Sequence, residues 1–296
     1  MSLSADLAGV KVGNAYPVRI VGVINVSPES FYKGSVRTSP EEIVSSALSI
    51  AGEGADIIDI GAMSTAPYLK TEISTEEEKK RLVSAVKAVK QTVKIPISAD
   101  TIRSQSAEAA IKAGADILND ISGLKNDEKM AKVAVEYDVP LVVVANEKRQ
   151  SKGAPMERVT LALRQSLNIA QKAGVSLEKV VIDPGIGFFR HARGPWYVWD
   201  CNVIGNLEKL RILERPIHVG VSRKSFIGKI LNQDEPEQRL FGSLSATAIA
   251  VFEGAHMIRT HDVASTVEVV RLAEQIRKNC SLNMQSFNSL SVGFTR

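Results

Sequence analysis

Short apolar runs and amphipathic segments alternate along most of the chain. The apolar runs are rich in β-branched residues and bounded by turn or polar residues, which is typical of strands buried in a sheet. Eight such runs lie at 20–26, 56–60, 97–99, 117–119, 141–145, 180–182, 217–221 and 256–259. Segments with helical periodicity follow them at 40–53, 74–91, 103–113, 127–137, 157–173, 202–213, 237–253 and 262–278.

This alternation predicts an α/β fold, a single (β/α)8 TIM barrel, because eight strand–helix pairs in about 250 residues match the size of that fold. An open, doubly wound sheet is the alternative with the same alternation. Glycines such as Gly114 and Gly174 follow helical segments, where they supply left-handed C-caps. No Pro-, Gly- or Ser-rich linker divides the chain, so we expect one domain at 1–280 and a polar tail at 281–296.

The composition is that of a globular domain. Apolar residues make up 44% of the chain and charged residues 24%, which excludes disordered, collagen-like and coiled-coil proteins. Lys and Arg number 37 against 33 Asp and Glu, and the net charge of +4 is scattered without a long basic run. We therefore expect no nucleic acid partner, while the excess suits an anionic small molecule.

The sequence pattern predicts neither a signal peptide nor a membrane span. The start of the chain has no charged segment followed by an apolar one, and no run approaches the roughly 20 apolar residues of a membrane span. Cys201 and Cys280 form neither a CxxC pair nor a disulfide framework. We therefore expect a cytoplasmic protein without a membrane partner.

Polar residues follow seven of the eight predicted strands, at the end where a TIM barrel carries its site. They include Asn25, Asp59, Asp100, Asn119, Asp183, Lys224 and Arg259, with His261 just beyond the last strand. Any one of them could merely cap a helix. Their joint placement at one end of the barrel predicts a binding site.

These residues divide into two chemical kinds. Asp100, Asn119 and Asp183 present acceptors that suit a planar ligand with an amidine-like donor edge, as in pterins and guanines. Donors and positive charge suited to phosphate come from four residues: Arg223, Lys224, Arg259 and His261. A heterocycle attached to a diphosphate would use both kinds.

At these residues the sequence resembles the dihydropteroate synthase family and, more broadly, the pterin-binding barrels. The resemblance extends from about Val18 to Ile276. Its motifs occur in the family's order: GVINVSPESF at 22–31, DIGAMST at 59–65, SADT at 98–101, NDISG at 119–123, DPGIGF at 183–188, SRKSFIG at 222–228 and RTHD at 259–262. Single motifs such as the Pro-Gly turn could be chance, but the ordered set is specific.

The resemblance implies a transferase that condenses 6-hydroxymethyl-7,8-dihydropterin pyrophosphate with an arylamine, usually p-aminobenzoate, and releases pyrophosphate. It also implies a homodimer and a dissociative reaction, in which the C–O bond breaks before the amine attacks. The family's pterin-holding positions match Asp100, Asn119, Asp183 and Lys224, and the substrate-binding set includes Thr65. The positions that hold the diphosphate and its Mg2+ match Asn25, Arg259 and His261, with Asn25 as the metal ligand. Asp100, Asp183, Lys224, Arg259 and His261 form the expected catalytic set.

The departures from the family pattern collect around the second substrate. Ala66 stands where the family usually has arginine, and Glu29 stands where aspartate is usual. The fifth strand continues as Ala-Asn-Glu147 without the family's Met-His-Met-Gln type of sequence. The pterin half of the site therefore looks intact, and either p-aminobenzoate or a modified derivative remains open as the acceptor.

An apparent insertion of about ten residues, FRHARGPWYVWDC at 189–201, precedes the sixth helical segment. It holds Trp196 and Trp199 next to Arg190, His191 and Arg193. One interpretation is a lid that adds an aromatic platform and positive charge over the amine site. The other is that the aromatic residues pack this loop down or form a subunit contact.

Two rival functions remain. Methyltetrahydrofolate:corrinoid methyltransferases share the barrel and the pterin pocket, but a methyl transfer has no diphosphate for Arg259 and His261 to hold. A non-catalytic pterin-binding homologue is the second rival, and Asn25, Arg259 and His261 count against it, because simple pterin binding needs no residues for a leaving group. His218 and His256 lie in or beside strands and are expected to be core histidines. No cluster has the ligand spacing of a zinc site, so the expected Mg2+ arrives with the diphosphate.

Overall fold

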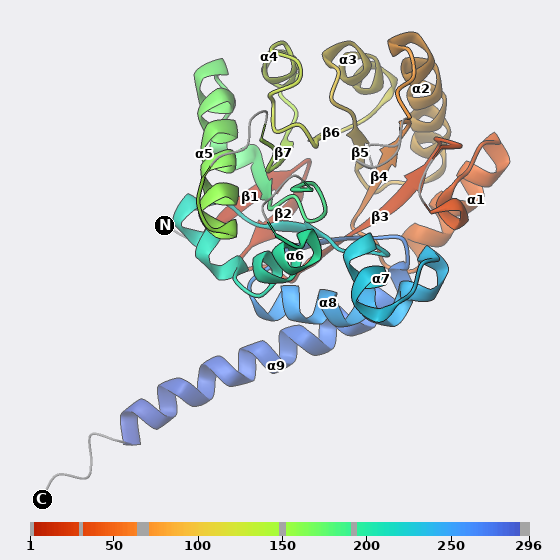
Figure 1. Cartoon of the computed structure of the whole chain (residues 1–296). Coiled ribbons are helices and arrows are strands. Elements are labelled where there is room, and N and C mark those ends of the chain that lie inside the picture. Colours follow the sequence, from red (N-terminus) through yellow and green to blue (C-terminus); the bar gives the residue numbers. More distant parts are fainter. Residues whose placement is uncertain (1–2, 30–31, 64–70, 148–151, 191–193, 291–296) are drawn as a thin grey trace, which may run out of the picture.

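The computed structural model describes residues 3–29, 32–63, 71–147, 152–190 and 194–290. Within them, eight parallel strands form a barrel surrounded by helices (Figure 1). The strands are β3 (Arg19–Asn25), β4 (Ile57–Gly61), β5 (Ile97–Asp100), β6 (Ile117–Asp120), β7 (Leu141–Val144), β8 (Val180–Asp183), β9 (His218–Gly220) and β10 (Met257–Thr260). Their order is β8-β7-β6-β5-β4-β3-β10-β9, and a parallel bridge between Ile182 and Ile217 joins the two ends. The predicted TIM barrel is confirmed, and the open sheet is excluded.

The outer ring consists of α1 (Pro40–Gly52), α2 (Thr75–Thr92), α3 (Ser104–Ala113), α4 (Met130–Glu136), α5 (Pro155–Ala173), α6 (Trp196–Ile204), α7 (Ser225–Leu231), α8 (Leu240–Phe252) and α9 (Val263–Leu290). The expected caps are present. Ser39 begins α1 with a capping box, and Gly114 and Gly174 end α3 and α5 with φ angles of 118° and 98°.

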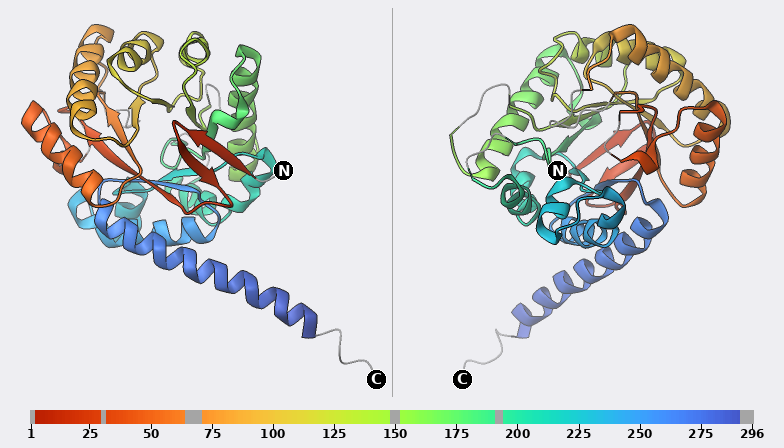
Figure 2. Two further views of the ribbon diagram at one scale, coloured as in Figure 1. Left: turned by 180° about the vertical axis from the view of Figure 1, so that it is seen from behind. Right: turned by 45° about the vertical axis from the view of Figure 1, so that its right-hand side comes forward.

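The helical pattern misplaced the bounds of two helical segments and missed one helix. Where one segment was expected at 202–213, α6 begins earlier, at Trp196 inside the apparent insertion, and ends before Gly205, and the 3-10 helix η3 (Leu207–Leu213) follows it. The seven-residue helix α7 was missed, since it is too short for a clear periodicity. The helix α9 continues past the expected end at Lys278 to Leu290, as no Gly or Pro interrupts it. Figures 1 and 2 show this helix projecting away from the barrel.

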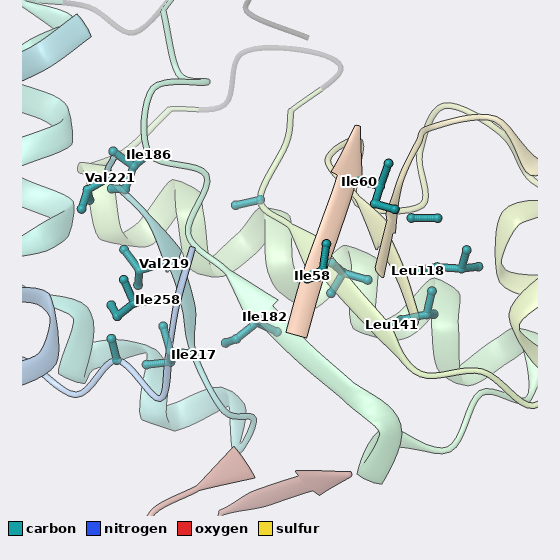
Figure 3. Packing of buried hydrophobic residues seen from close by; sticks show 14 of the residues in the cluster. Ile58, Ile60, Leu118, Leu141, Ile182, Ile186, Ile217, Val219, Val221 and Ile258 are labelled. Atoms are coloured by element: carbon teal, nitrogen blue, oxygen red, sulfur yellow. The ribbon is translucent and has the colours of Figure 1, made fainter. Parts of the chain in front are cut away.

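Alternate residues of each strand face opposite sides of the barrel wall. Outward residues such as Ile58, Leu118, Leu141 and Ile258 pack against the helices and belong to one large cluster (Figure 3). The inward residues form a second cluster that contains Val21, Ile57, Ile117, Val142, Val181 and Met257. Two residues further along β4, β6, β8 and β10, the same face carries Asp59, Asn119, Asp183 and Arg259. An apolar layer therefore lies beneath a polar one inside the barrel.

A two-stranded hairpin that the sequence analysis missed closes the lower end of the barrel. It consists of β1 (Ser4–Leu7) and β2 (Val10–Gly13), joined by a turn with positive φ at Ala8 and Gly9. The buried side chains of Ala5, Leu7 and Val12 pack into the inward apolar cluster. The alternation of ADLAGVKV could have indicated the hairpin, but Ala8 is an unusual residue for this turn. With this end closed, the polar layer is left facing the opposite end.

Among the helices in the described part of the chain, none combines the length and the apolar composition needed to cross a bilayer.

Candidate active site

Arg259 lies at the centre of the polar layer, between two carboxylates. Its Nε donates to Asp59 Oδ2 at 2.7 Å, and its Nη2 donates to Asp100 Oδ2 at 3.0 Å. Burial alone would lower the pKa of Arg259, but the charges of Asp59 and Asp100 outweigh it and raise the pKa above its ordinary value. A permanently charged guanidinium therefore holds β4 and β5 to β10 at this level of the barrel.

Several buried oxygen atoms around Arg259 lack a hydrogen-bond donor among the described residues. Asn119 Nδ2 donates to Asp59 Oδ2 at 3.2 Å. Within the described residues, the buried atoms Asp59 Oδ1, Asp100 Oδ1 and Asn119 Oδ1 have no hydrogen-bond partner. Burial, followed by the charge of Asp59, raises the pKa of Asp100 to about 7, although Arg259 acts in the opposite direction. Buried acceptors without partners are rare in folded proteins, so this layer is prepared for a ligand that brings donors.

Asp183 ends β8 and is held on both of its oxygens. Its Oδ1 accepts from the backbone N–H of Gly185 at 2.7 Å, and its Oδ2 lies 2.7 Å from Nδ1 of His218. Gly185 has a φ of 73°, and a Cβ there would lie 2.4 Å from the carbonyl oxygen of Ala145, so this turn requires glycine. The DPGIGF segment thereby fixes the direction of the Asp183 carboxylate.

Lys224 joins this turn to the segment that follows β9. Its Nζ donates to the carbonyl oxygen of Ile186 and lies 5.2 Å from the centre of the Phe188 ring. Burial lowers the pKa of Lys224 to about 8, while the charges of Asp183 and Asp200 act in the opposite direction. The ammonium group is therefore charged at neutral pH and lies in the field of Asp183.

His261 is neutral in this structure, in contrast to the positive charge expected from the sequence. Burial, followed by the charges of Arg259, Arg223 and Lys224, lowers its pKa to about 3. Its Nδ1 lies 2.9 Å from Ser222 Oγ, and the ring of Tyr32 meets its ring edge-on at 5.2 Å. His261 therefore offers a diphosphate a neutral N–H donor, and the cationic charge comes from its neighbours.

Arg223 does not supply that charge, which corrects the sequence analysis. Its guanidinium forms two hydrogen bonds with Asp262, at 2.9 and 2.6 Å, and donates to two backbone carbonyls, those of Pro236 and Glu237. It also lies 4.5 Å from the centre of the Tyr32 ring. The side chain is buried and engaged in holding the loop after β9 to the N-terminus of α9.

Asn25 ends β3 next to Asp100. Its Nδ2 donates to Ser35 Oγ at 2.7 Å, which turns the amide so that Oδ1 faces the space above Gly61. A Cβ at Gly61 would lie 3.4 Å from Asn25 Oδ1 and 3.7 Å from Asp100 Oδ2, so the two oxygens converge there. No three His, Cys, Asp or Glu side chains are grouped as metal ligands anywhere in the described ranges. Thr65 and the neighbouring Ala66 lie outside those ranges.

The apparent insertion packs down onto the rim of the barrel at its aromatic residues. The Trp199 ring stacks on Phe189 with 5.1 Å between centroids, and the guanidinium of Arg158 lies 4.6 Å from the centre of Trp199. Arg158 is itself paired with Glu147, which follows β7. This contact agrees with the interpretation of Trp199 as a packing residue. His191 and Arg193 lie outside the described residues.

The charged residues of the insertion contact the DPGIGF turn. Arg190 Nε donates to the carbonyl oxygen of Gly187 at 3.0 Å, and its guanidinium lies 3.6 Å from the centre of the Trp196 ring. Asp200 Oδ1 accepts from the backbone N–H of Gly187 at 2.8 Å, and burial raises the pKa of this carboxyl. The insertion therefore supports the turn that carries Asp183 and contacts Lys224.

Sequence reasoning missed several residues that build this site. Asp59 was seen in a motif but was given no role, and His218 was assigned to the core, yet both contact predicted site residues. The period-two spacing of Ile57 with Asp59 could have placed Asp59 on the inward face. No comparable signal exists for Asp200, which contacts the site from α6, or for Tyr32, which contacts it from a loop.

Comparisons with known proteins agree with this geometry. Residues 21–261 match the family described as pterin binding enzyme. The dihydropteroate synthase of Clostridium beijerinckii is 38% identical over 258 residues, covering 87% of this chain and 93% of that protein. The solved dihydropteroate synthase of Clostridium difficile, in the presence of pteroic acid, has a TM-score of 0.79 and 34% identity, covering 88% of this chain and 97% of that one.

A third relative carries the second substrate of the suspected reaction. The Xanthomonas albilineans dihydropteroate synthase with 4-aminobenzoic acid has a TM-score of 0.82 and 30% identity, covering 94% of this chain and 99% of that one. The family match and the curated relative both span most of the chain, and the motifs that carry the resemblance supply the residues of the polar layer. The chain therefore belongs to the dihydropteroate synthase family of pterin-binding enzymes.

Proposed function

We propose that this transferase condenses 6-hydroxymethyl-7,8-dihydropterin pyrophosphate with p-aminobenzoate, or a close derivative of it, and releases pyrophosphate. The observation that carries the proposal is the layer of buried acceptors around Arg259, next to the cation of Lys224. A relative with 34% identity was solved in the presence of pteroic acid, and one with 30% identity was solved with 4-aminobenzoic acid. The two ligands correspond to the product side and to the amine of this reaction.

The acceptors suit the donor edge of the pterin. Asn119 Oδ1 and Asp100 Oδ1 have no partner among the described residues, and the Asp183 carboxylate is held in one orientation by Gly185 and His218. A pterin places an amino group and a ring N–H side by side, so it can donate to such acceptors. Charge-assisted hydrogen bonds of this kind are about twice as strong as neutral ones.

The diphosphate leaving group is stabilised by Arg259, Lys224 and His261. The reaction breaks the C–O bond between the pterin methylene carbon and the diphosphate, and the amine nitrogen then forms the new C–N bond. The amine proton passes to water or to the departing diphosphate, so a strong general base is not needed. Arg259 and Lys224 stabilise the developing negative charge, and His261 adds a neutral donor.

Mg2+ is proposed to arrive with the diphosphate. Asn25 Oδ1, beside the Asp100 carboxylate, is the oxygen that the chain offers it. Mg2+ usually keeps several water ligands and takes others from substrate phosphates, so it needs few oxygen ligands from the protein. When bound, it would neutralise part of the leaving-group charge.

The two rival functions fit these observations less well. A corrinoid-dependent methyl transfer or simple pterin binding involves no diphosphate for the donors of Arg259, Lys224 and His261 to bind. This chain also matches dihydropteroate synthases over nearly their whole length. A cytoplasmic location, as expected from the sequence, is part of the proposal.

The function is tested by measuring pyrophosphate release from the pterin pyrophosphate. We expect release that depends on Mg2+ and on p-aminobenzoate, with dihydropteroate identified by mass spectrometry. Parallel reactions without amine, with EDTA, and with a ribosylated arylamine separate hydrolysis, metal dependence and acceptor choice. Absence of a condensed product with every arylamine, or methyl transfer from methyltetrahydrofolate, would contradict the proposal.

A homodimer is proposed from an exposed apolar face on α8 and α9. On α8, Phe241 is 81% exposed, and Ile249 and Phe252 lie on the same side of the helix. On the adjacent α9, Leu272 and Ile276 are also exposed. Contiguous apolar patches of this kind mark protein interfaces, and a second copy of the chain would cover this one symmetrically.

The dimer is tested by light scattering during size-exclusion chromatography. We expect a dimer at micromolar concentration for the wild type and a monomer for Phe241→Glu. As a matched control, Leu161→Glu changes another exposed apolar residue, on α5, and should remain dimeric. A monomeric wild type would rule the dimer out.

A further inference from the structure

His218 is a buried histidine that contacts the site from below. It begins β9, its side chain is 3% exposed, and its Nδ1 lies 2.7 Å from Asp183 Oδ2. In the sheet it pairs with Met257, whose side chain belongs to the inward apolar cluster. A polar ring at this level therefore needs a reason, because burying it without a partner costs free energy.

We propose that His218 is a positioning residue, which fixes the Asp183 carboxylate in the orientation that binds the pterin. The inference rests on the proposed function, since it assigns Asp183 to the pterin. Gly185 holds Oδ1 through a backbone N–H, and His218 holds Oδ2, so the two contacts set the plane of the carboxylate. An ionised Asp183 only accepts, so the proton of this contact lies on Nδ1 of the ring.

A small cavity beneath the polar layer links His218 to the rest of the site. Its volume is about 10 Å³, close to what one water molecule needs. The polar residues that line it are Asp59, Ser98, Asn119 and His218. Asp59 Oδ1 and Asn119 Oδ1 lack partners within the described ranges, and the Nδ1–H tautomer leaves Nε2 of His218 as a further acceptor. One water molecule in this cavity would donate to Asp59 Oδ1 and to Nε2 of His218, which leaves Asn119 Oδ1 for the pterin.

His256 is also buried and lies near β9, but its hydrogen-bond partners differ from those of His218. His256 Nδ1 accepts from the backbone N–H of Ile217 at 3.1 Å, and its Nε2 lies 2.9 Å from Asn14 Oδ1. Those contacts join β9 to the N-terminal segment and involve no site residue. His256 is therefore a matched control for the loss of a buried imidazole.

The test compares His218→Leu, His218→Asn and His256→Leu. The probe is 6-hydroxymethyl-7,8-dihydropterin, whose Kd is measured by calorimetry, and KM is measured for p-aminobenzoate. We expect His218→Leu to weaken pterin binding about tenfold, as for loss of a hydrogen bond to a charged group, with KM for the amine within about twofold. His218→Asn keeps an N–H donor near the Nδ1 position and should stay within about threefold of the wild type. His256→Leu should lower thermal stability and leave pterin affinity unchanged.

Several outcomes would overturn the proposal. They are an unchanged pterin Kd in His218→Leu, equal weakening in both His218 variants, and equal weakening in His256→Leu. If His218→Leu does not fold, nitrogen NMR of the wild-type ring decides: we expect an Nδ1–H signal that shifts when pterin is added, and an unmoved signal contradicts the inference. A wild type that binds pterin but releases no pyrophosphate would contradict the proposed function alone.

Discussion

Replacing Arg259 with methionine is expected to lower kcat by a factor of about 10² to 10³ and the free energy of unfolding by about 3–5 kcal/mol. The kinetic effect is the usual cost of removing one preorganised donor from a developing anion. The stability effect arises because the variant leaves Asp59 and Asp100 buried without their cation. Steady-state kinetics and urea denaturation at pH 7 measure the two effects separately.

A second substitution separates these two roles of Arg259. In the double variant with Asp59→Asn, one buried charge is removed together with the arginine, so most of the stability should return. Its turnover should remain low, because the leaving-group cation is still missing. Arg259→Lys keeps the charge but cannot contact both carboxylates in the same way, so we expect intermediate values. A single variant that is stable and fully active would remove Arg259 from both roles.

Replacing Asp183 with asparagine is expected to weaken pterin binding by about 10- to 100-fold. The amide keeps the shape of the carboxylate and can still accept from the backbone N–H of Gly185. It loses the negative charge toward the pterin, and its amide N–H₂ would face the Nδ1–H of His218. Loss of a charged hydrogen bond costs about 1.5–3 kcal/mol, which corresponds to this range.

Asp200→Asn is the matched control for this measurement. Asp200 is equally buried and accepts from Gly187 in the same turn, and the substitution again keeps the accepting oxygen. Because Asp200 supports the turn from the side of α6, its loss of charge should change pterin Kd by less than about threefold. Equal weakening in the two variants would mean that Asp183 acts through the turn and does not contact the pterin.

The sequence predicted what depends on local pattern. All eight barrel strands were found, because each is an apolar run that can be identified along the chain, and seven of them also have a polar end. Asn25, Asp100, Asn119, Asp183 and Arg259 lie at those ends in the structure, as expected. The spacing along single strands was therefore enough to place these residues at one end of the barrel.

The contacts between strands could not be predicted in the same way. That Arg259 pairs with Asp59 and Asp100 depends on strands separated by more than one hundred residues, and no pattern within β10 encodes it. The neutral state of His261 likewise depends on burial and on the cations Arg223 and Lys224 from another segment, in addition to the neighbouring Arg259. Arg223 was misassigned because its partner Asp262 becomes a neighbour only when the barrel forms.

The hairpin of β1 and β2 imposes an order on folding. Residues 4–13 precede all eight barrel strands along the chain, but Leu7 packs against a layer that includes Met257, in the last of these strands. That layer is complete only after β10 has joined the sheet, so the hairpin can dock only after the strands that follow it. Contacts that join such distant positions slow folding, because a long loop must close before they form. A nascent chain halted before β10 would hold an unsealed barrel, with its inner apolar side chains open to water.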